Sequence, residues 1–220
     1  MTSENMIQIQ IFTFNPFEEN TYVAYDETGD AIVVDPGCYE REEKEELDEF
    51  IKKNQLNVVL LVNTHCHIDH VLGNDHIKTK YKVPFLIHKR EEQMLRAVNT
   101  YAGNYGFFEY REVQPDKLID DRDEITFGDS KFNIIFLPGH SPGHVGLYNQ
   151  DQGILLSGDV LFQNSIGRTD LPGGDTDTLL KSIKEKLFVL PEDVVVYPGH
   201  GPTTTLGEEM RSNPFCAIKR

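Results

Sequence analysis

The chain has 220 residues, 39% of them hydrophobic, and a formal net charge of −15. This length suits one large domain or two small ones, and no run approaches the ~18 apolar residues that a membrane-spanning helix needs. The negative charge disfavours nucleic acids and anionic membrane surfaces as partners, because both would repel the chain at long range.

The N-terminus and the cysteines predict a cytoplasmic protein. Residues 1–5 show no basic region before an apolar stretch, as a secretory signal peptide would. Cys38, Cys66 and Cys216 are far apart in sequence, and an odd, sparse set of cysteines does not make a disulfide framework. The oligomeric state does not follow from the sequence.

The first half of the chain predicts strands and then helices. Alternating or continuous apolar residues, typical of strands, cover residues 7–11, 21–25, 31–34, 58–62 and 85–87. The charged run 40–49 lies in a helical pattern, and two further helices are predicted over residues 71–81 and 89–98. In the first of these helices, Leu47, Phe50 and Ile51 have the spacing of a face that packs on a core.

The second half repeats this order. Strand-like segments cover residues 124–127, 132–137, 146–148, 154–156 and 194–197. Helical spacing over 178–187 predicts a helix with Thr176 or Asp177 as its cap. Two such halves, each a sheet with helices on its outer face, predict an α/β fold, a four-layer αβ/βα sandwich. The pattern also allows other α/β or α+β arrangements.

The sharpest feature is the segment Thr64-His65-Cys66-His67-Ile68-Asp69-His70, which follows a predicted buried strand and precedes a predicted helix. It places four candidate ligands on one turn, and imidazole and carboxylate are the groups that Zn²⁺ or Fe²⁺ sites use. His65 and His67 can converge on one metal if the turn is tight, which directs Asp69 and His70 to a second position nearby. The alternative is a polar surface cluster that binds no metal. The presence of three histidines within six positions disfavours this alternative.

Three further residues follow apolar strands on turns that contain Gly or Pro. They are His140 in Pro-Gly-His, Asp159 in Gly-Asp and His200 in Pro-Gly-His. A ligand at a strand end, on a stiff turn, is held in fixed geometry. Each of these residues alone could be structural, but together with the first cluster they predict a metal site. The expected structural residues are His76, His88, His144 and Cys66.

The ordered set His-x-His-x-Asp-His, Pro-Gly-His, Gly-Asp and Pro-Gly-His resembles the metallo-β-lactamase superfamily over nearly the whole chain. Residues 158–162, 167–170 and 198–203 resemble its glyoxalase II-like (hydroxyacylglutathione hydrolase-like) branch. The ending, residues 205–215, resembles the short single-domain members of that branch. The resemblance implies the metallo-β-lactamase fold, in one domain that covers residues 1–220.

The resemblance also implies two divalent metal ions, Zn first, with Fe or Mn as alternatives. Site one is then His65, His67 and His140, site two is Asp69, His70 and His200, and Asp159 bridges the two. The implied activity is hydrolysis of S-lactoylglutathione-like or related thioesters, in which two cations lower the pKa of a shared water to roughly 7 and the resulting hydroxide attacks the carbonyl. Asp69 is then also catalytic, since it orients that hydroxide.

Two segments outside the ligand set are candidates for substrate binding. The guanidinium of Arg168 can bind a substrate carboxylate through two parallel hydrogen bonds. Alternatively, Arg168 is a structural loop anchor that pairs with Asp170 or Asp175. The aromatic residues 99–110 form either a lid over an apolar pocket, part of the core or an oligomer interface. Full-length glyoxalase II enzymes hold glutathione with a C-terminal helical domain, whereas this chain stops twenty residues after His200. Recognition of glutathione therefore does not follow from the resemblance.

A persulfide dioxygenase, an oxidoreductase on the same fold, is the main alternative function. That family resembles this chain at His-Cys-His-x-Asp-His and Gly-Arg-Thr-Asp, and by analogy it would hold one Fe²⁺ through two histidines and Asp159. Residues 198–203 resemble the hydrolases instead. A β-lactamase is less expected, since the enzymes with a cysteine ligand have it where Asp159 stands. Charge and length disfavour a nuclease, and a complete set of competent ligands disfavours a non-catalytic binding module.

Overall fold

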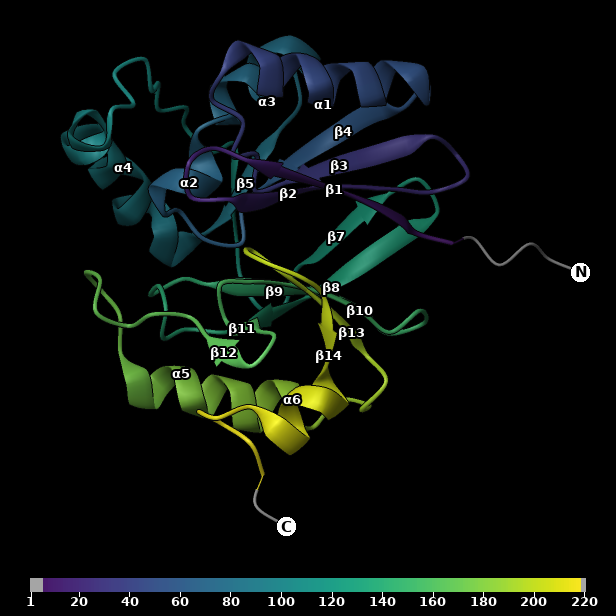
Figure 1. Ribbon diagram of the computed structural model, residues 1–220. Coiled ribbons are helices and arrows are strands. Elements are labelled where there is room, and N and C mark those ends of the chain that lie inside the picture. Colours follow the sequence, from purple (N-terminus) through teal and green to yellow (C-terminus); the bar gives the residue numbers. More distant parts are fainter. Residues whose placement is uncertain (1–5, 219–220) are drawn as a thin grey trace, which may run out of the picture. The chain divides into compact units, whose positions relative to one another are not determined.

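The computed structural model describes residues 6–218, and its contacts divide the chain into two compact units. Unit 1 runs to Ile119 and includes Thr126–Lys131, and unit 2 comprises Asp120–Ile125 and the chain from Phe132 onward. Each unit is built around one six-stranded sheet (Figure 1). The expectation about a signal peptide concerns residues 1–5, which lie outside the described residues. A single domain over residues 1–220 stays a prediction.

The sheet of unit 1 has the strand order β1-β2-β3-β4-β5-β6. Its strands are β1 (Gln8–Phe14), β2 (Glu19–Tyr25), β3 (Asp30–Val34), β4 (Asn57–Val62), β5 (Phe85–His88) and β6 (Lys117–Ile119). The first two pairings are antiparallel, and β3, β4, β5 and β6 run parallel to one another. Parallel strands bring their carboxyl ends to one edge of the sheet, the edge where α/β proteins bind their ligands.

The helices of unit 1 bury their apolar faces against this sheet. They are α1 (Arg41–Lys53), α2 (Ile68–Val71), α3 (Asn74–Tyr81) and α4 (Glu92–Tyr101), with the 3₁₀ turns η1 (Lys89–Glu91) and η2 (Ala102–Tyr105). Figure 1 shows α1 and α3 together on one face of the sheet, where Leu47, Ile51 and Ile77 join the core. Helix α1 starts at a capping box, in which the Glu43 carboxylate accepts from the backbone N–H of Glu40 at 2.9 Å.

The predicted helix over 71–81 is confirmed for Asn74–Tyr81, but it is not continuous, because the chain turns at residues 72–73 between α2 and α3. At the break, the backbone N–H of Gly73 donates to the Pro36 carbonyl at 2.7 Å. A Cβ at position 73 would lie 2.5 Å from the Cys38 sulfur. The close approach of these two chain segments therefore requires glycine, and it turns the chain between the two helices.

The second sheet has the strand order β14-β13-β10-β9-β8-β7. It lies in unit 2 except for residues 126–127 of β7 and 130–131 of β8. Its strands are β7 (Glu124–Phe127), β8 (Ser130–Phe136), β9 (Val145–Asn149), β10 (Ile154–Gly158), β13 (Val195–Pro198) and β14 (Thr204–Thr205). The pair β10–β13 is parallel, and β8–β9, β9–β10 and β13–β14 are antiparallel. A separate small hairpin consists of β11 (Leu161–Phe162) and β12 (Ser165–Ile166).

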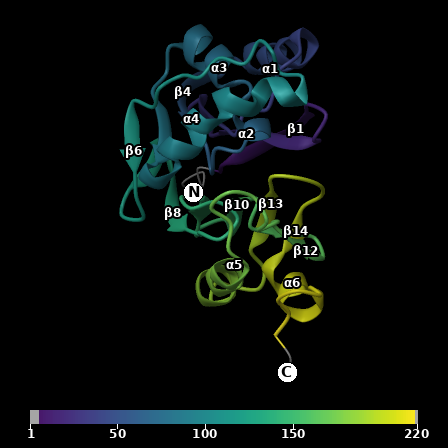
Figure 2. The same cartoon turned by 90° about the vertical axis from the view of Figure 1, so that its left-hand side faces the viewer.

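Two helices cover one face of this second sheet (Figures 1 and 2). Helix α5 (Thr176–Ser182) continues as a π-helical turn, η3 (Ile183–Leu187), and α6 (Leu206–Ser212) follows β14. Leu179, Ile183 and Leu187 enter the core at the predicted spacing. The predicted cap at Thr176 or Asp177 is wrong. Asp175 caps the helix, since its carboxylate accepts from the Thr178 N–H at 2.7 Å.

All three cysteines are free and buried, as the absence of a disulfide framework predicted. Burial raises the pKa of the Cys66 thiol well above its ordinary value, so this thiol stays protonated and packs as an apolar side chain. Within residues 6–218, none of the helices has the length and apolar character needed to cross a membrane.

The close packing at Gly73 yields a stability prediction. Gly73→Ala inserts a methyl group against Cys38 and the Pro36 carbonyl, and we expect the free energy of unfolding to fall by about 1–3 kcal/mol in urea titrations. Gly103→Ala is the control, because the nearest atom to its added Cβ is a Phe108 ring carbon at 3.6 Å. The control should change stability by less than about 0.5 kcal/mol, and equal losses in both variants would contradict the packing argument.

Candidate metal centre

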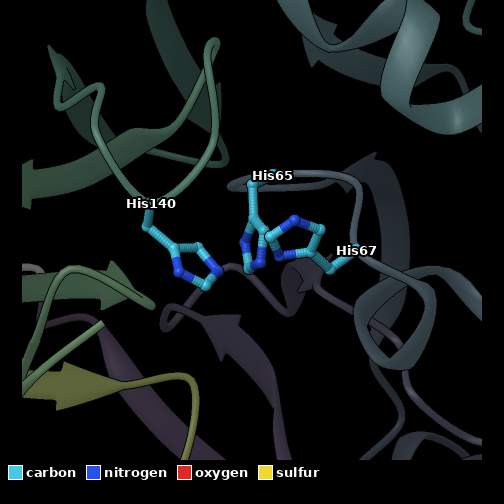
Figure 3. Close-up of side chains that lie close together, drawn as sticks. All are labelled: His65, His67 and His140. Carbon is cyan, nitrogen blue, oxygen red and sulfur yellow. The ribbon is translucent and has the colours of Figure 1, made fainter. Parts of the chain in front are cut away.

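Four of the predicted ligands meet on the turn that follows β4 in unit 1. The ring centroid of His65 lies 4.8 Å from that of His67 and 4.1 Å from that of His70. Nε2 of His70 lies 3.7 Å from Oδ2 of Asp69. All four side chains are buried, none exposing more than 9% of its surface. Figure 3 shows the rings of His65 and His67 projecting from the same loop of unit 1.

A buried carboxylate that the sequence analysis missed supports this cluster. Asp35 follows β3 and accepts from the N–H and the hydroxyl of Thr64 at 2.7 and 2.6 Å. It lies 3.2 Å from Nδ1 of His70, and the Thr64 hydroxyl lies 3.1 Å from Nδ1 of His65. Because Nδ1 of each ring faces one of these supports, Nε2 is the atom that each ring can offer to a metal.

Asp35 could itself be taken for a ligand, since it, His65 and His70 place one potential ligand atom each within 4.8 Å of one another. Its oxygens, however, accept three hydrogen bonds, the third from Asn63 at 3.3 Å. We therefore assign Asp35 a supporting role. The signal that identified the other residues also fits Asp35, because it ends an apolar strand and precedes Pro36-Gly37.

The backbone around Asp69 is packed too closely for a side chain at position 37. A Cβ on Gly37 would lie 2.0 Å from Oε2 of Glu19 and 2.7 Å from the carbonyl oxygen of Asp69. The side-chain amide of Asn15 donates to the carbonyls of Gly37 and Asp69, both at 3.0 Å. Burial raises the pKa of Glu19 well above its ordinary value, so its neutral form is favoured beside His70. The β1–β2 hairpin thus holds the Asp69 backbone in place.

The other three predicted ligands meet within unit 2. Oδ2 of Asp159 lies 3.5 Å from Nε2 of His140 and 3.5 Å from Nε2 of His200. Metal–ligand bonds of 2.0–2.2 Å in a tetrahedral centre separate two neighbouring ligand atoms by about 3.4 Å. Both pairs therefore have the spacing of ligands that share a cation, with Asp159 common to the two pairs.

Backbone groups and a second histidine orient these ligands. Nδ1 of His140 lies 2.7 Å from the Arg168 carbonyl oxygen. Because this oxygen can only accept a hydrogen bond, the ring hydrogen lies on Nδ1, and Nε2 is available to a metal. The backbone N–H of Asp159 donates to Nε2 of His144 at 3.0 Å, so His144 is structural. A Cβ on Gly167 would lie 1.9 Å from the Asp159 carbonyl oxygen, so only glycine fits there. His140 projects from its own loop of unit 2 (Figure 3).

The other histidines and Cys66 have the structural roles predicted for them. His76 lies 3.1 Å from both carboxylate oxygens of Asp48. Nδ1 of His88 accepts from the Arg90 N–H at the start of η1. Cys66 lies in the core of unit 1.

The Arg168 side chain pairs with Asp170, one of the two partners considered for a loop anchor. Its Nε and an Nη donate to the two carboxylate oxygens, each at 2.7 Å, and both side chains are exposed. This hydrogen bonding lowers the pKa of Asp170 to about 2. Asp175, the other considered partner, caps α5 instead. Contact of Arg168 with a substrate carboxylate stays a prediction.

The aromatic segment 99–110 combines core and exposed side chains. Phe107 is buried, with its ring centroid 4.9 Å from that of Tyr39 and 6.1 Å from that of Phe17. Tyr105 and Phe108 are 57% and 83% exposed. The segment is therefore anchored through Phe107. A lid formed by its exposed residues stays a prediction.

The ligand cluster in each unit offers imidazole nitrogens and carboxylate oxygens, the donors that suit Zn²⁺, Fe²⁺ and Mn²⁺. The family model described as the metallo-beta-lactamase superfamily matches residues 14–200. The chain belongs to this superfamily. Its predicted family and fold class are therefore confirmed, and its donor set fits the divalent metals of a metallo-hydrolase.

One similar relative is a hydroxyacylglutathione hydrolase, GloC, of Haemophilus influenzae. It is 36% identical to this chain over 97% of the chain and 100% of its own length, in agreement with the glyoxalase II-like branch. Among solved structures, the BLEG-1 B3 metallo-beta-lactamase has a TM-score of 0.84 at 38% identity. The di-iron-bound form of TTHA1623 has a TM-score of 0.83 at 34% identity. Each alignment covers 94% of this chain and 99% of the other.

The support from Asp35 yields a metal-binding prediction. Asp35→Asn keeps the shape of the side chain but removes the charge beside His70, and we expect affinity for Zn²⁺ to fall about 10- to 100-fold in chelator competition. Asp30→Asn is the matched control, since Asp30 lies at the start of β3 and its carboxylate contacts Asn57. Unchanged affinity in Asp35→Asn would show that Asp35 does not support the ligands.

Proposed function

We propose that the protein is a metal-dependent thioester hydrolase that acts on S-lactoylglutathione-like or related thioesters in the cytoplasm. In this proposal, His65, His67 and His140 hold one divalent cation, and Asp69, His70 and His200 hold the other. Asp159 contributes to both. Zn²⁺ is the first candidate metal, and the di-iron form of TTHA1623 makes iron the second.

The position of Asp159 is the observation that carries this proposal. One carboxylate oxygen lies at ligand spacing from two histidines that follow different strands of unit 2. One cation held by His140, His200 and Asp159 would give the same spacing, so the assignment of a second cation is supported by the further donors Asp69 and His70 of unit 1. The 36% identity to a hydroxyacylglutathione hydrolase over the whole of that protein supports thioesters as substrates.

When bound, two cations would supply an acidified water and polarise the substrate carbonyl. The residues of the chain provide the geometry. Asp69 is buried and its backbone is held by Asn15, so its carboxylate can accept a hydrogen bond from the attacking water and orient it. The Arg168 side chain is exposed, and the main-chain carbonyl of the same residue contacts Nδ1 of His140. From there its guanidinium can exchange Asp170 for a substrate carboxylate.

Removal of Asp159 tests the metal centre directly. We expect Asp159→Ala to lose tightly bound metal, measured by elemental analysis, and to lose hydrolysis of S-lactoylglutathione and of a simpler thioester. Asp151→Ala, in the turn between β9 and β10, is the control and should keep both. Retained activity with a full metal complement in Asp159→Ala would refute the shared-ligand role.

The similarity to the BLEG-1 B3 metallo-beta-lactamase favours β-lactams as a second candidate substrate class. A chromogenic cephalosporin belongs in the same assay, and faster turnover of the β-lactam than of every thioester would replace our proposal. The persulfide dioxygenase alternative predicts one iron per chain and oxygen uptake with a persulfide. The hydrolase predicts neither a need for oxygen nor its consumption.

The Arg168–Asp170 pair yields a specificity prediction. We expect Arg168→Ala to raise KM about tenfold or more for thioesters that carry a carboxylate, and less for neutral ones, because a charge-assisted bond of about 1.5 kcal/mol or more is lost. Asp170→Ala is the matched control, since it releases the guanidinium and should not raise KM for acidic substrates. Equal effects of Arg168→Ala on both substrate classes would end the carboxylate assignment.

A further inference from the structure

The loop that carries His140 receives three hydrogen bonds from one other segment of unit 2. Strand β8 ends at Phe136, and the chain then turns through residues 137–144 before β9 begins. Main-chain carbonyls at the start of this turn accept from residues in or beside α5. The donors are the Asp175 N–H to Gly139 at 2.7 Å, the Ser182 hydroxyl to Pro138 at 2.7 Å and the Lys186 amine to Phe136 at 2.6 Å.

The two side-chain donors lie on one face of the helix, because residues four apart in a helix are neighbours. A serine in a helix commonly bonds the carbonyl four residues before it, but the buried Ser182 donates to the His140 loop instead. The helix widens into the π-helical turn η3 directly after Ser182. Such turns are rare in proteins, and those that occur are often found at functional sites.

Lys186 is an unusual residue for this position. Its amine is half-buried and lies 5.0 Å above the ring centroid of Phe136, and burial lowers its pKa. Removing a charged amine from water costs free energy unless the amine is hydrogen-bonded. The bond to the Phe136 carbonyl supplies that compensation and ties the end of β8 to the helix.

The loop backbone itself touches the helix. Gly139 has φ = +133°, and a Cβ there would lie 2.3 Å from the backbone nitrogen of Leu179. No side chain fits between the loop and α5, so the position of the loop follows that of the helix. The next residue is His140, whose ring is held separately by the Arg168 carbonyl.

We propose that Ser182 and Lys186 are positioning residues for the metal ligand His140. They hold the loop backbone so that Nε2 of His140 stays at ligand distance from Asp159. This inference rests on the proposed metal centre for its effect on metal affinity, whereas its effect on loop geometry is independent of any substrate.

The test measures metal affinity and backbone exchange in single and double variants. Ser182→Ala and Lys186→Met each remove one donor, and we expect each to weaken binding of Co²⁺ or Zn²⁺ about tenfold, the lower end of the range for supporting hydrogen bonds. Amide hydrogen exchange at residues 139–141 should become faster, and the absorption spectrum of the Co²⁺-loaded protein should change. Ser182→Thr retains a hydroxyl and should restore much of the affinity.

Two control variants separate this role from general stability. Ser212→Ala removes a comparable serine-to-carbonyl bond inside α6, to Glu208 at 2.9 Å, and Lys181→Met alters an exposed lysine of α5. Both should match the wild type in affinity and exchange. Wild-type affinity and exchange in Ser182→Ala and Lys186→Met would overturn the inference. A wild-type protein that binds no metal would overturn the proposed function, and the exchange at residues 139–141 would still decide the role of the helix in holding the loop.

Discussion

The buried carboxylate of Asp35 is the constraint on which the histidine cluster of unit 1 depends. A carboxylate removed from water is costly unless it is hydrogen-bonded, and Thr64 provides two donors to it. The Thr64 hydroxyl also faces Nδ1 of His65, and the Asp35 carboxylate faces Nδ1 of His70. The interaction that makes the buried charge tolerable therefore also sets the orientation of two rings. Asp35 can do this because β3 and β4 are parallel neighbours and both end at this edge.

In unit 2, the predicted ligands are oriented mainly by backbone groups. The Arg168 carbonyl faces Nδ1 of His140, and His144 accepts from the backbone N–H of Asp159. Such contacts require chain segments to approach within hydrogen-bonding distance, which is why glycine occupies position 139 against α5 and position 167 against Asp159. Backbone supports are insensitive to the type of side chain at Arg168, so that side chain is available for another role.

In both units, contacts with other residues therefore fix the orientation of the predicted ligands. A preorganised ligand set loses little conformational entropy on binding, and its geometry is set by the supports more than by the ligands themselves. We propose that different residues select the substrate. Arg168 and the aromatic residues Tyr105 and Phe108 are exposed, and they can vary without disturbing the supports. This separation explains how one ligand set can serve hydrolases of different substrates.

The ligand types, the family and most strands could be predicted from the sequence, because a ligand motif and an alternating apolar pattern are local properties. The break at Gly73, the cap at Asp175 and the supporting role of Asp35 could not, although Asp35 follows the same strand–turn pattern as the ligands. The first and the third depend on contacts that tertiary structure creates, whereas the Asp175 cap is a local contact to Thr178, in a helix that begins two residues before the predicted range. Pro36 lies 37 residues before Gly73, Thr64 lies 29 residues after Asp35, and Ser182 lies 44 residues after the Pro138 carbonyl that it binds. Local pattern shows which residues can bind a metal, whereas only folding decides which other residues hold them in place.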